Sequence, residues 1–143
     1  MEDSVPPSLR PPLALRLLAV RGLVTITVAL AGNLGLLVAV QRAPFIDPFG
    51  PLSAGPVTLL TVLTATAATA IYGVLTRIWP DPDWLFFRVV VIVLAVSFLP
   101  DLAILQEDPD ATAGAIAVMM GMNVVVAAAS VVLLTDRYSP IRR

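Results

Sequence analysis

The sequence predicts an all-α protein that crosses a membrane four times as a helical bundle. Three observations predict this fold: four long apolar stretches, the short polar or proline-rich segments between them, and a composition that is 58% apolar and only 13% charged. Soluble domains average about 45–50% apolar and about 25% charged residues. Because a globule of this size buries only about 70% of its unfolded surface, the excess apolar surface must face lipid or a partner.

The first predicted span covers residues 13–40, after a polar, proline-rich segment (1–12) that predicts a disordered tail. Its uncharged part, Gly22–Val40, matches the ~20 residues that the hydrocarbon core requires. Arg16 and Arg21 precede that part, where long basic side chains extend to lipid headgroups. A cleaved signal peptide is the alternative, but its apolar stretch would be only about 7–15 residues long. An uncleaved membrane anchor is therefore favoured.

The second predicted span covers residues 57–78, and Pro56 is predicted as the first residue of that helix because its missing N–H costs nothing there. The loop 41–56 before it carries four prolines and enough apolar side chains to lie on the membrane surface. The many threonines in the span would favour a strand in a soluble protein. A lone strand would leave its backbone unsatisfied in lipid, so the apolar length favours a helix.

The third and fourth predicted spans cover residues 84–105 and 111–134. An aspartate directly precedes each of them, and aspartate is a favoured N-cap residue, so Asp83 and Asp110 are the predicted caps. The residues after the last span, 137–143, form a basic tail. Short connections between the spans predict antiparallel neighbours in the bundle.

Arginine is distributed unequally between the two sides of this bundle. Four spans bring both termini and the second loop to one side, which carries eight of the nine arginines, whereas the other side carries Arg42 alone. Basic residues in short flanking segments face the cytoplasm. Both termini are therefore predicted to be cytoplasmic, in a multi-pass protein of the cell membrane. The use of Arg in place of every Lys is also typical of a GC-rich prokaryotic genome.

Three residue types are missing from the chain, which contains no Cys, His or Lys. The absence of Cys excludes disulfides, iron–sulfur clusters and thiolate catalysis. The absence of His excludes His-ligated haem and the usual zinc sites, and the absence of Lys excludes Schiff bases and the P-loop lysine. We therefore expect no cofactor, no metal site and no enzymatic activity. An intramembrane enzyme would have to use Asp101, Ser97, Tyr72 or Ser130.

Asp101 is the single residue with the strongest functional signal. It follows Pro100 inside an apolar run, and an intramembrane carboxylate is costly enough to indicate a functional site. The alternative is that the third span ends near Leu99 and leaves Asp101 at the interface. Arg42 lies at a matching depth, so we predict an Asp101–Arg42 contact or a water-filled outer pocket under the loop 41–56. Its apolar walls would be Phe45, Ile46 and Phe49.

Two asparagines form a second polar constellation. Asn33 and Asn123 each lie about 16–18 Å inward from the start of their apolar stretch, near the bilayer centre. An amide at that depth requires a hydrogen-bonding partner, and the two are predicted to make interhelical polar contacts, with each other if they meet. A structural role is favoured over a substrate contact.

Several segments carry a resemblance to known proteins: GNLGLLVAV at 32–40, the loop APFIDPFGPLSAGP, the Thr/Ala-rich second span, FLPDLAIL at 98–105 and MNVVVAAA at 122–129. In these features the chain resembles a family of small prokaryotic four-helix integral membrane proteins of unknown function. The resemblance covers about residues 13–136, the predicted membrane domain. It implies the fold and the membrane location, and it implies no activity.

Two functions are compatible with this sequence. The first is a non-enzymatic accessory or self-associating subunit, whose partners are the lipid bilayer and other membrane subunits or further copies of itself, and no nucleic acid. The alternative is a small transporter or channel-like carrier with an outer-side polar site at Asp101. The multidrug carriers of four short helices use a Glu in their first span and show little arginine bias. This chain lacks that acid and has a strong bias, which favours the accessory subunit.

Overall fold

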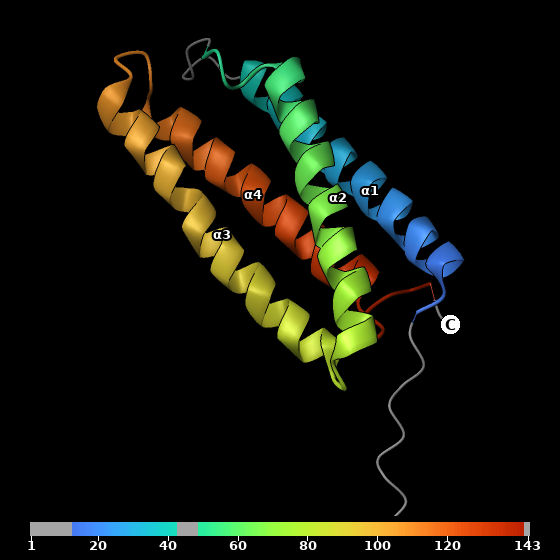
Figure 1. Cartoon of the computed structure of the whole chain (residues 1–143). Helices are drawn as coiled ribbons and strands as arrows, with labels where there is room; N and C mark the ends of the chain where they lie inside the picture. Colours follow the sequence, from blue (N-terminus) through green and yellow to red (C-terminus); the bar gives the residue numbers. More distant parts are fainter. Residues whose placement is uncertain (1–12, 43–48, 142–143) are drawn as a thin grey trace, which may run out of the picture.

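Four long helices make up the part of the chain that the computed structural model describes, residues 13–42 and 49–141 (Figure 1). They are α1 (Leu15–Gln41), α2 (Ala54–Ile78), α3 (Pro82–Glu107) and α4 (Ala113–Leu134). Each is long and apolar enough to cross a membrane, so the predicted all-α, four-helix class is confirmed. The tail predicted for residues 1–12 and the last two residues of the basic tail lie outside the described residues.

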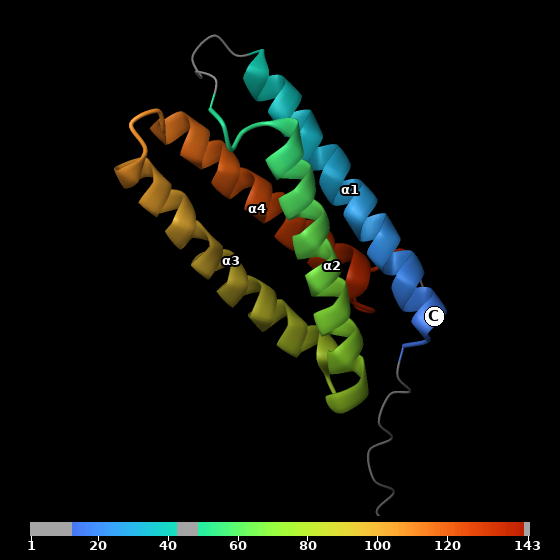
Figure 2. The ribbon, with the colours of Figure 1, turned by 45° about the horizontal axis from the view of Figure 1, so that its top comes forward.

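The four helices do not pack equally against one another. α1 lies along both α2 and α4, and α3 lies along α4, whereas α3 has a smaller contact with α2 and none with α1 in the described chain. Figures 1 and 2 show α2 and α3 close together near their connecting loop and diverging toward their other ends, with α4 between them. We call the end with the α2–α3 loop, where the described chain begins at Leu13 and ends at Ile141, the terminal end, and the opposite end the far end.

α1 and α2 make the closest contact of the bundle. Ala29 and Ala65 are fully buried between them. A Cβ added at Gly22 would lie 2.6 Å from Thr69 Cγ2, and one added at Gly73 would lie 2.5 Å from Leu18 Cδ2. Small residues that let helix backbones approach closely are a common basis of packing inside membranes. This pair of helices therefore forms the tightly packed side of the bundle.

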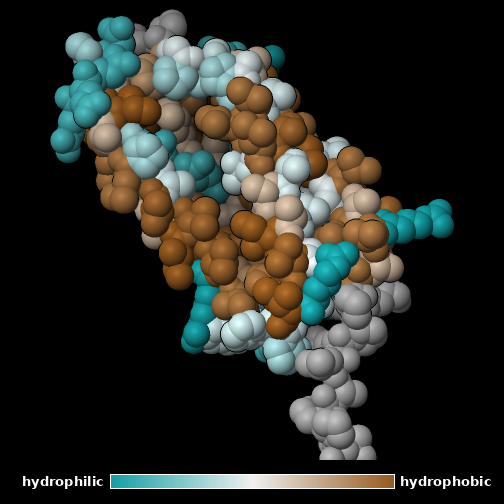
Figure 3. Space-filling model, viewed as in Figure 1, coloured by the Kyte–Doolittle hydropathy of each residue, from teal (hydrophilic) through white to brown (hydrophobic). Residues whose placement is uncertain are grey.

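α3 is the peripheral helix. Only 6% of its most apolar stretch is buried, against 22%, 28% and 33% for α1, α2 and α4. Figure 3 shows a broad apolar band over the surface, with hydrophilic residues toward the two ends of the molecule. That band is the surface expected of helices whose outer faces contact lipid. Together the helix lengths and the apolar band indicate a multi-pass membrane protein.

The predicted helix caps were wrong for α3 and α4. Asp81 caps α3, with Pro82 in the first turn, and Thr112 caps α4; each side chain accepts a backbone N–H from the first turn. Proline is favoured at the first helical position, which moves the cap from Asp83 to the residue before the proline. Asp110 lies in the turn before Thr112 and does not cap α4.

α2 begins earlier than predicted. Its first residue is Ala54 and its N-cap position is Ser53, so that Pro56 lies in the first turn rather than at the first position. The first four N–H groups of a helix have no intrahelical acceptor, and a proline is therefore tolerated at either place. The earlier start brings the end of the loop 41–56 close against the far end of the bundle, where Leu52 is buried.

Candidate functional site

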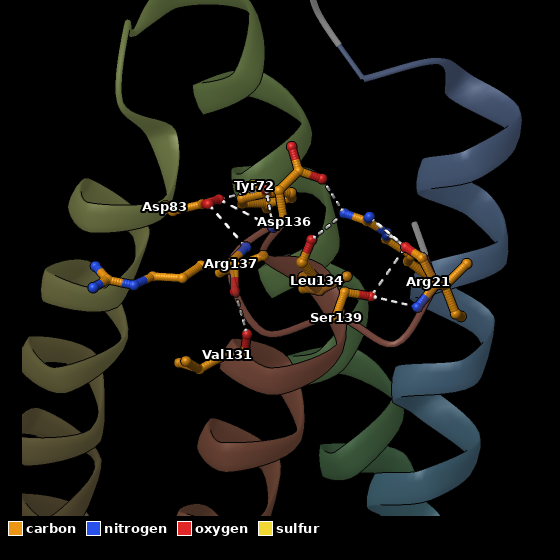
Figure 4. Close-up of polar contacts among 10 residues, drawn as sticks. Arg21, Tyr72, Asp83, Val131, Leu134, Asp136, Arg137 and Ser139 are labelled. Atoms are coloured by element: carbon orange, nitrogen blue, oxygen red, sulfur yellow. Dashed lines mark hydrogen bonds and ion pairs between the residues drawn. The ribbon is translucent and has the colours of Figure 1, made fainter. Parts of the chain in front are cut away.

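Arg21 lies inside the terminal end and does not extend to lipid headgroups, contrary to the prediction. It is only 1% exposed. Its Nη1 donates to Asp136 Oδ1 at 2.7 Å and to the Leu134 carbonyl at 2.9 Å, and its Nε donates to the Ile141 carbonyl at 3.0 Å (Figure 4). The last residue of α4 and the chain that folds back after it supply these acceptors. A buried guanidinium is stable only when its charge and its donors are compensated in this way.

Asp83 is the second centre of this polar network. Its Oδ1 accepts from the Tyr72 hydroxyl at 2.7 Å and from the Asp136 N–H at 3.3 Å, and its Oδ2 accepts from the Arg137 N–H at 3.2 Å. The Tyr72 ring is fully buried and packs edge-on against Phe86 at 5.1 Å. Figure 4 shows how Tyr72 and Asp83, from two helices, converge on the segment after α4. Each of these groups has its partners, so the network serves to hold the terminal end together.

The far end contains a cavity to which every helix contributes a polar side chain. The cavity has a volume of about 100 Å³ and is lined by Asn33 of α1, Thr61 of α2, Asp101 of α3 and Asn123 of α4. Asn33 Nδ2 donates to Thr61 Oγ1 at 2.8 Å, and Asn123 Nδ2 donates to Asp101 Oδ2 at 2.9 Å. Figure 3 shows a hydrophilic patch in a hollow between α2 and α3 on this face. Three residues singled out in the sequence thus line one cavity.

The hydrogen-bond partners in this cavity differ from those predicted from the depths of the residues in the membrane. Asn33 bonds Thr61 and Asn123 bonds Asp101, so the two asparagines do not form a pair with one another. α3 continues through Pro100 to Glu107, so the alternative in which the helix ends near Leu99 is wrong. Asp101 is 6% exposed and lies within the helix.

The predicted contact between Asp101 and Arg42 is absent from the described part of the chain. Arg42 is exposed at the end of α1. The loop 41–56 does contribute Pro51 and Leu52 to the cavity wall. Phe49, predicted as another wall residue, is instead buried in the apolar cluster beside the cavity, and the remaining two predicted wall residues, Phe45 and Ile46, lie outside the described residues.

Two acceptor atoms at this cavity have no hydrogen-bond donor. Asn33 Oδ1 is buried and unpartnered, in a side chain that is 2% exposed. Asp101 Oδ1 accepts no hydrogen bond among the residues that the structure describes, because the Asn123 amide reaches only Oδ2. More than about 90% of buried polar groups in proteins have a partner, and leaving one without costs about 1–3 kcal/mol. A bound molecule or water that donates hydrogen bonds would remove this cost.

The cavity continues into an apolar cleft between α2 and α3, with α4 as its floor. This cleft has a volume of about 200 Å³ and shares Thr64, Asn123 and Val126 with the cavity. Ile71 and Val93 line it from opposite sides and are 40% and 50% exposed, so the cleft opens on the lipid-facing surface. Its floor contains a further unpartnered group, the hydroxyl of Ser130, in a side chain that is 2% exposed. The cleft could not be predicted from the sequence, because it follows from the divergence of two helices.

The side chains that an enzyme would have to use are spread over the molecule. Ser97 donates to the Leu94 carbonyl of its own helix, and Tyr72 donates to Asp83 at the terminal end. Asp101 is held by Asn123 at the far end. Within the described chain no hydrogen bond joins any two of the four candidates Ser97, Tyr72, Asp101 and Ser130. The cavity and cleft together instead resemble a binding site with one polar and one apolar part.

Comparison with known proteins gives a family and no activity. No curated protein and no solved structure matches this chain. One family model matches residues 7–140, which include all four helices, the cavity and the polar network apart from Ile141. This chain therefore belongs to that family, a family of unknown function (DUF6069).

Proposed function

We propose that this protein is a non-enzymatic membrane protein that binds a small amphiphilic molecule between α2 and α3, in the manner of a small carrier. The observation that carries the proposal is the cavity at the far end, which Asn33 and Asp101 both line. Asn33 Oδ1 is buried there without a partner, and Asp101 Oδ1 accepts no hydrogen bond among the described residues. The apolar cleft that continues from it would take the apolar part of the same molecule. Binding sites of this kind combine mostly apolar walls with a few polar groups that fix orientation.

The cleft also suggests how such a molecule would enter. α2 and α3 diverge toward the far end and meet only over a short stretch, so a molecule dissolved in the bilayer would reach the cavity sideways without crossing the tightly packed α1–α2 side. α3 would be the helix that moves, because it is the least buried of the four.

The accessory-subunit function remains a second candidate, and the exposed α3 face is the observation that favours it. Phe87, Ile92, Val96 and Leu99 are each more than half exposed along this helix. Another membrane helix could cover them, although lipid would satisfy the same face equally well. A partner on α3 and a molecule in the cleft are distinguishable by what remains bound on purification.

The test is purification of the full chain in native lipid particles, followed by mass spectrometry of the bound small molecules and proteins. Ala67→Phe would fill the cleft, which Ala67 lines from α2. Leu63→Phe is the matched control, because Leu63 is 57% exposed on the same helix and does not line the cleft or the cavity. We expect a small molecule that wild type and Leu63→Phe retain and Ala67→Phe loses. Identical small-molecule contents in all three, with a stoichiometric protein partner, would replace this proposal with the accessory subunit.

The orientation in the membrane is part of the same proposal. The Arg bias supports cytoplasmic termini in the cell membrane, which would place the cavity in the outer half of the bilayer. A reporter fused after Arg143 should then report the cytoplasm, and one inserted at Gly50 should report the outside. Both reporters on one side would contradict the four-span topology, and exchanged sides would place the cavity toward the cytoplasm.

A further inference from the structure

The charges around the cavity are unbalanced. Asp101 is a buried carboxyl group, and among the described residues no Arg lines the cavity or the adjoining cleft. Its one hydrogen-bond donor in the described chain is the neutral amide of Asn123. By contrast, the buried Arg21 at the terminal end has a carboxylate at 2.7 Å. A carboxylate in a medium of low dielectric is stabilised most strongly by a positive charge at short range.

The unpartnered hydrogen-bonding atoms at the cavity also favour a positively charged ligand group. The atoms that lack partners at the cavity are acceptors: Asn33 Oδ1 and Asp101 Oδ1. They come from opposite sides of the bundle, α1 and α3, and both side chains line the same space. A single headgroup that satisfied both atoms would have to donate at least two hydrogen bonds, and a primary alkylammonium group supplies three donors and a positive charge. An anionic or purely accepting headgroup would be repelled by both atoms.

We propose that the cavity binds the ammonium group of a cationic single-chain amphiphile, with Asp101 as the counter-ion, Asn33 as a second acceptor and the alkyl chain in the α2–α3 cleft. This inference rests on the proposed function and names the chemical class of its ligand. The cleft wall is formed by apolar side chains such as Phe86 and Val90, which suit an alkyl chain, and the hydroxyl of Ser130 lies in its floor.

The experiment uses the full chain in nanodiscs of phosphatidylcholine, with binding corrected for empty nanodiscs. The two probes are tritiated dodecylammonium and tritiated dodecanol, which share a chain and differ in charge. Asp101→Asn keeps the shape and an oxygen for Asn123 while removing the charge. Glu107→Gln is the matched control, because Glu107 is an exposed acid about 1.7 turns further along α3.

We expect saturable binding of dodecylammonium that weakens at least about thirtyfold in Asp101→Asn, the lower end of the range for loss of one member of a buried charge pair. Dodecanol should bind equally well to wild type and Asp101→Asn, and Glu107→Gln should behave as wild type toward both probes. Asn33→Leu should weaken dodecylammonium binding by a smaller factor, and this variant tests the inference if Asp101→Asn does not fold. Ala67→Phe should weaken both probes.

The outcomes separate this inference from the proposed function. If Asp101→Asn leaves dodecylammonium binding unchanged while Ala67→Phe weakens the binding of both probes, the cleft binds amphiphiles but Asp101 is not a counter-ion. This inference is then wrong, and the proposed function stands. If dodecylammonium does not bind saturably to wild type, the inference is wrong whatever dodecanol does. If neither probe binds and no small molecule is retained on purification, the proposed function fails with it.

Discussion

The two ends of this molecule use buried polar groups in opposite ways. At the terminal end Asp83 accepts three hydrogen bonds on its two oxygens, and Arg21 donates to a carboxylate and two carbonyls. At the far end Asp101 accepts one hydrogen bond from Asn123, and Asn33 has an acceptor without a partner. The polar groups of the first arrangement find their partners within the chain, whereas the acceptors of the second require a hydrogen-bond donor from a bound molecule or water.

A structural polar cluster can be distinguished from a binding site by whether its buried groups have partners. Both clusters are buried and both contain an aspartate, so burial and charge alone do not separate them. The hydrogen-bond partners do separate them. A network in which every group has a partner stabilises the fold, whereas unpartnered buried groups destabilise it and are retained only when they serve another purpose. Substitutions at the two ends should therefore have different effects on stability and on binding.

The largest expected loss of stability follows from Arg21→Met. Removing one member of a buried ion pair costs about 3–5 kcal/mol, and the substitution also takes a donor from the Leu134 and Ile141 carbonyls. The free energy of unfolding in mixed micelles with increasing SDS would measure the loss. Arg16→Met is the matched control, because Arg16 is exposed on the same helix, and it should change the stability by less than about 0.5 kcal/mol. Equal effects of the two substitutions would show that the contacts of Arg21 contribute little.

The next largest effect concerns the hydroxyl of Tyr72. Tyr72→Phe keeps the ring against Phe86 and removes the donor that bonds Asp83, so a buried acceptor loses one of its partners. We expect a loss of about 1–3 kcal/mol in the same unfolding measurement. Tyr138→Phe is the control, since Tyr138 is 56% exposed and should show almost no change. A loss below about 0.5 kcal/mol in Tyr72→Phe would indicate that the terminal network is not a stabilising unit.

The smallest effects are expected at the far end. Asn33→Leu removes one hydrogen bond together with an unpartnered acceptor, so the two contributions offset each other and the stability should change by less than about 1 kcal/mol. Because Asn33 and Asn123 have different partners, the change in Asn33→Leu/Asn123→Leu should equal the sum of the single changes within about 0.5 kcal/mol. A strong departure from additivity would show that the two amides act on each other.

The fold was predictable from the sequence because the bilayer restricts both the length and the type of a membrane-spanning element. The length of the hydrocarbon core sets the length of a span, and unsatisfied backbone groups exclude other structures. The four apolar stretches therefore predict four helices, with errors at the caps where Pro82 and Thr112 decide the local geometry.

The candidate site was predictable only in its residues. Asp101, Asn33 and Asn123 stand out because polar groups in apolar stretches are costly. Their partners were not predictable, since they depend on how α3 is rotated and tilted against α4. The terminal network was missed because Arg21 is contacted by residues more than 100 positions away in the chain, and a snorkelling arginine has the same sequence signature.

A pair of isosteric substitutions tests most directly whether the two ends differ in this way. Asp83 accepts hydrogen bonds on both oxygens, so in Asp83→Asn the new NH₂ group must face a donor in either orientation. Asp101 accepts on one oxygen only within the described chain, so in Asp101→Asn the amide can keep Asn123 as its donor and turn its NH₂ group to the cavity.

The measurement is the free energy of unfolding of both variants and of wild type, in one detergent and without added ligand. We expect Asp83→Asn to lose about 1–3 kcal/mol and Asp101→Asn to remain within about 0.5 kcal/mol of wild type or to exceed it. Equal losses of more than about 1 kcal/mol in both variants would contradict the distinction, because Asp101 would then be a structural residue like Asp83.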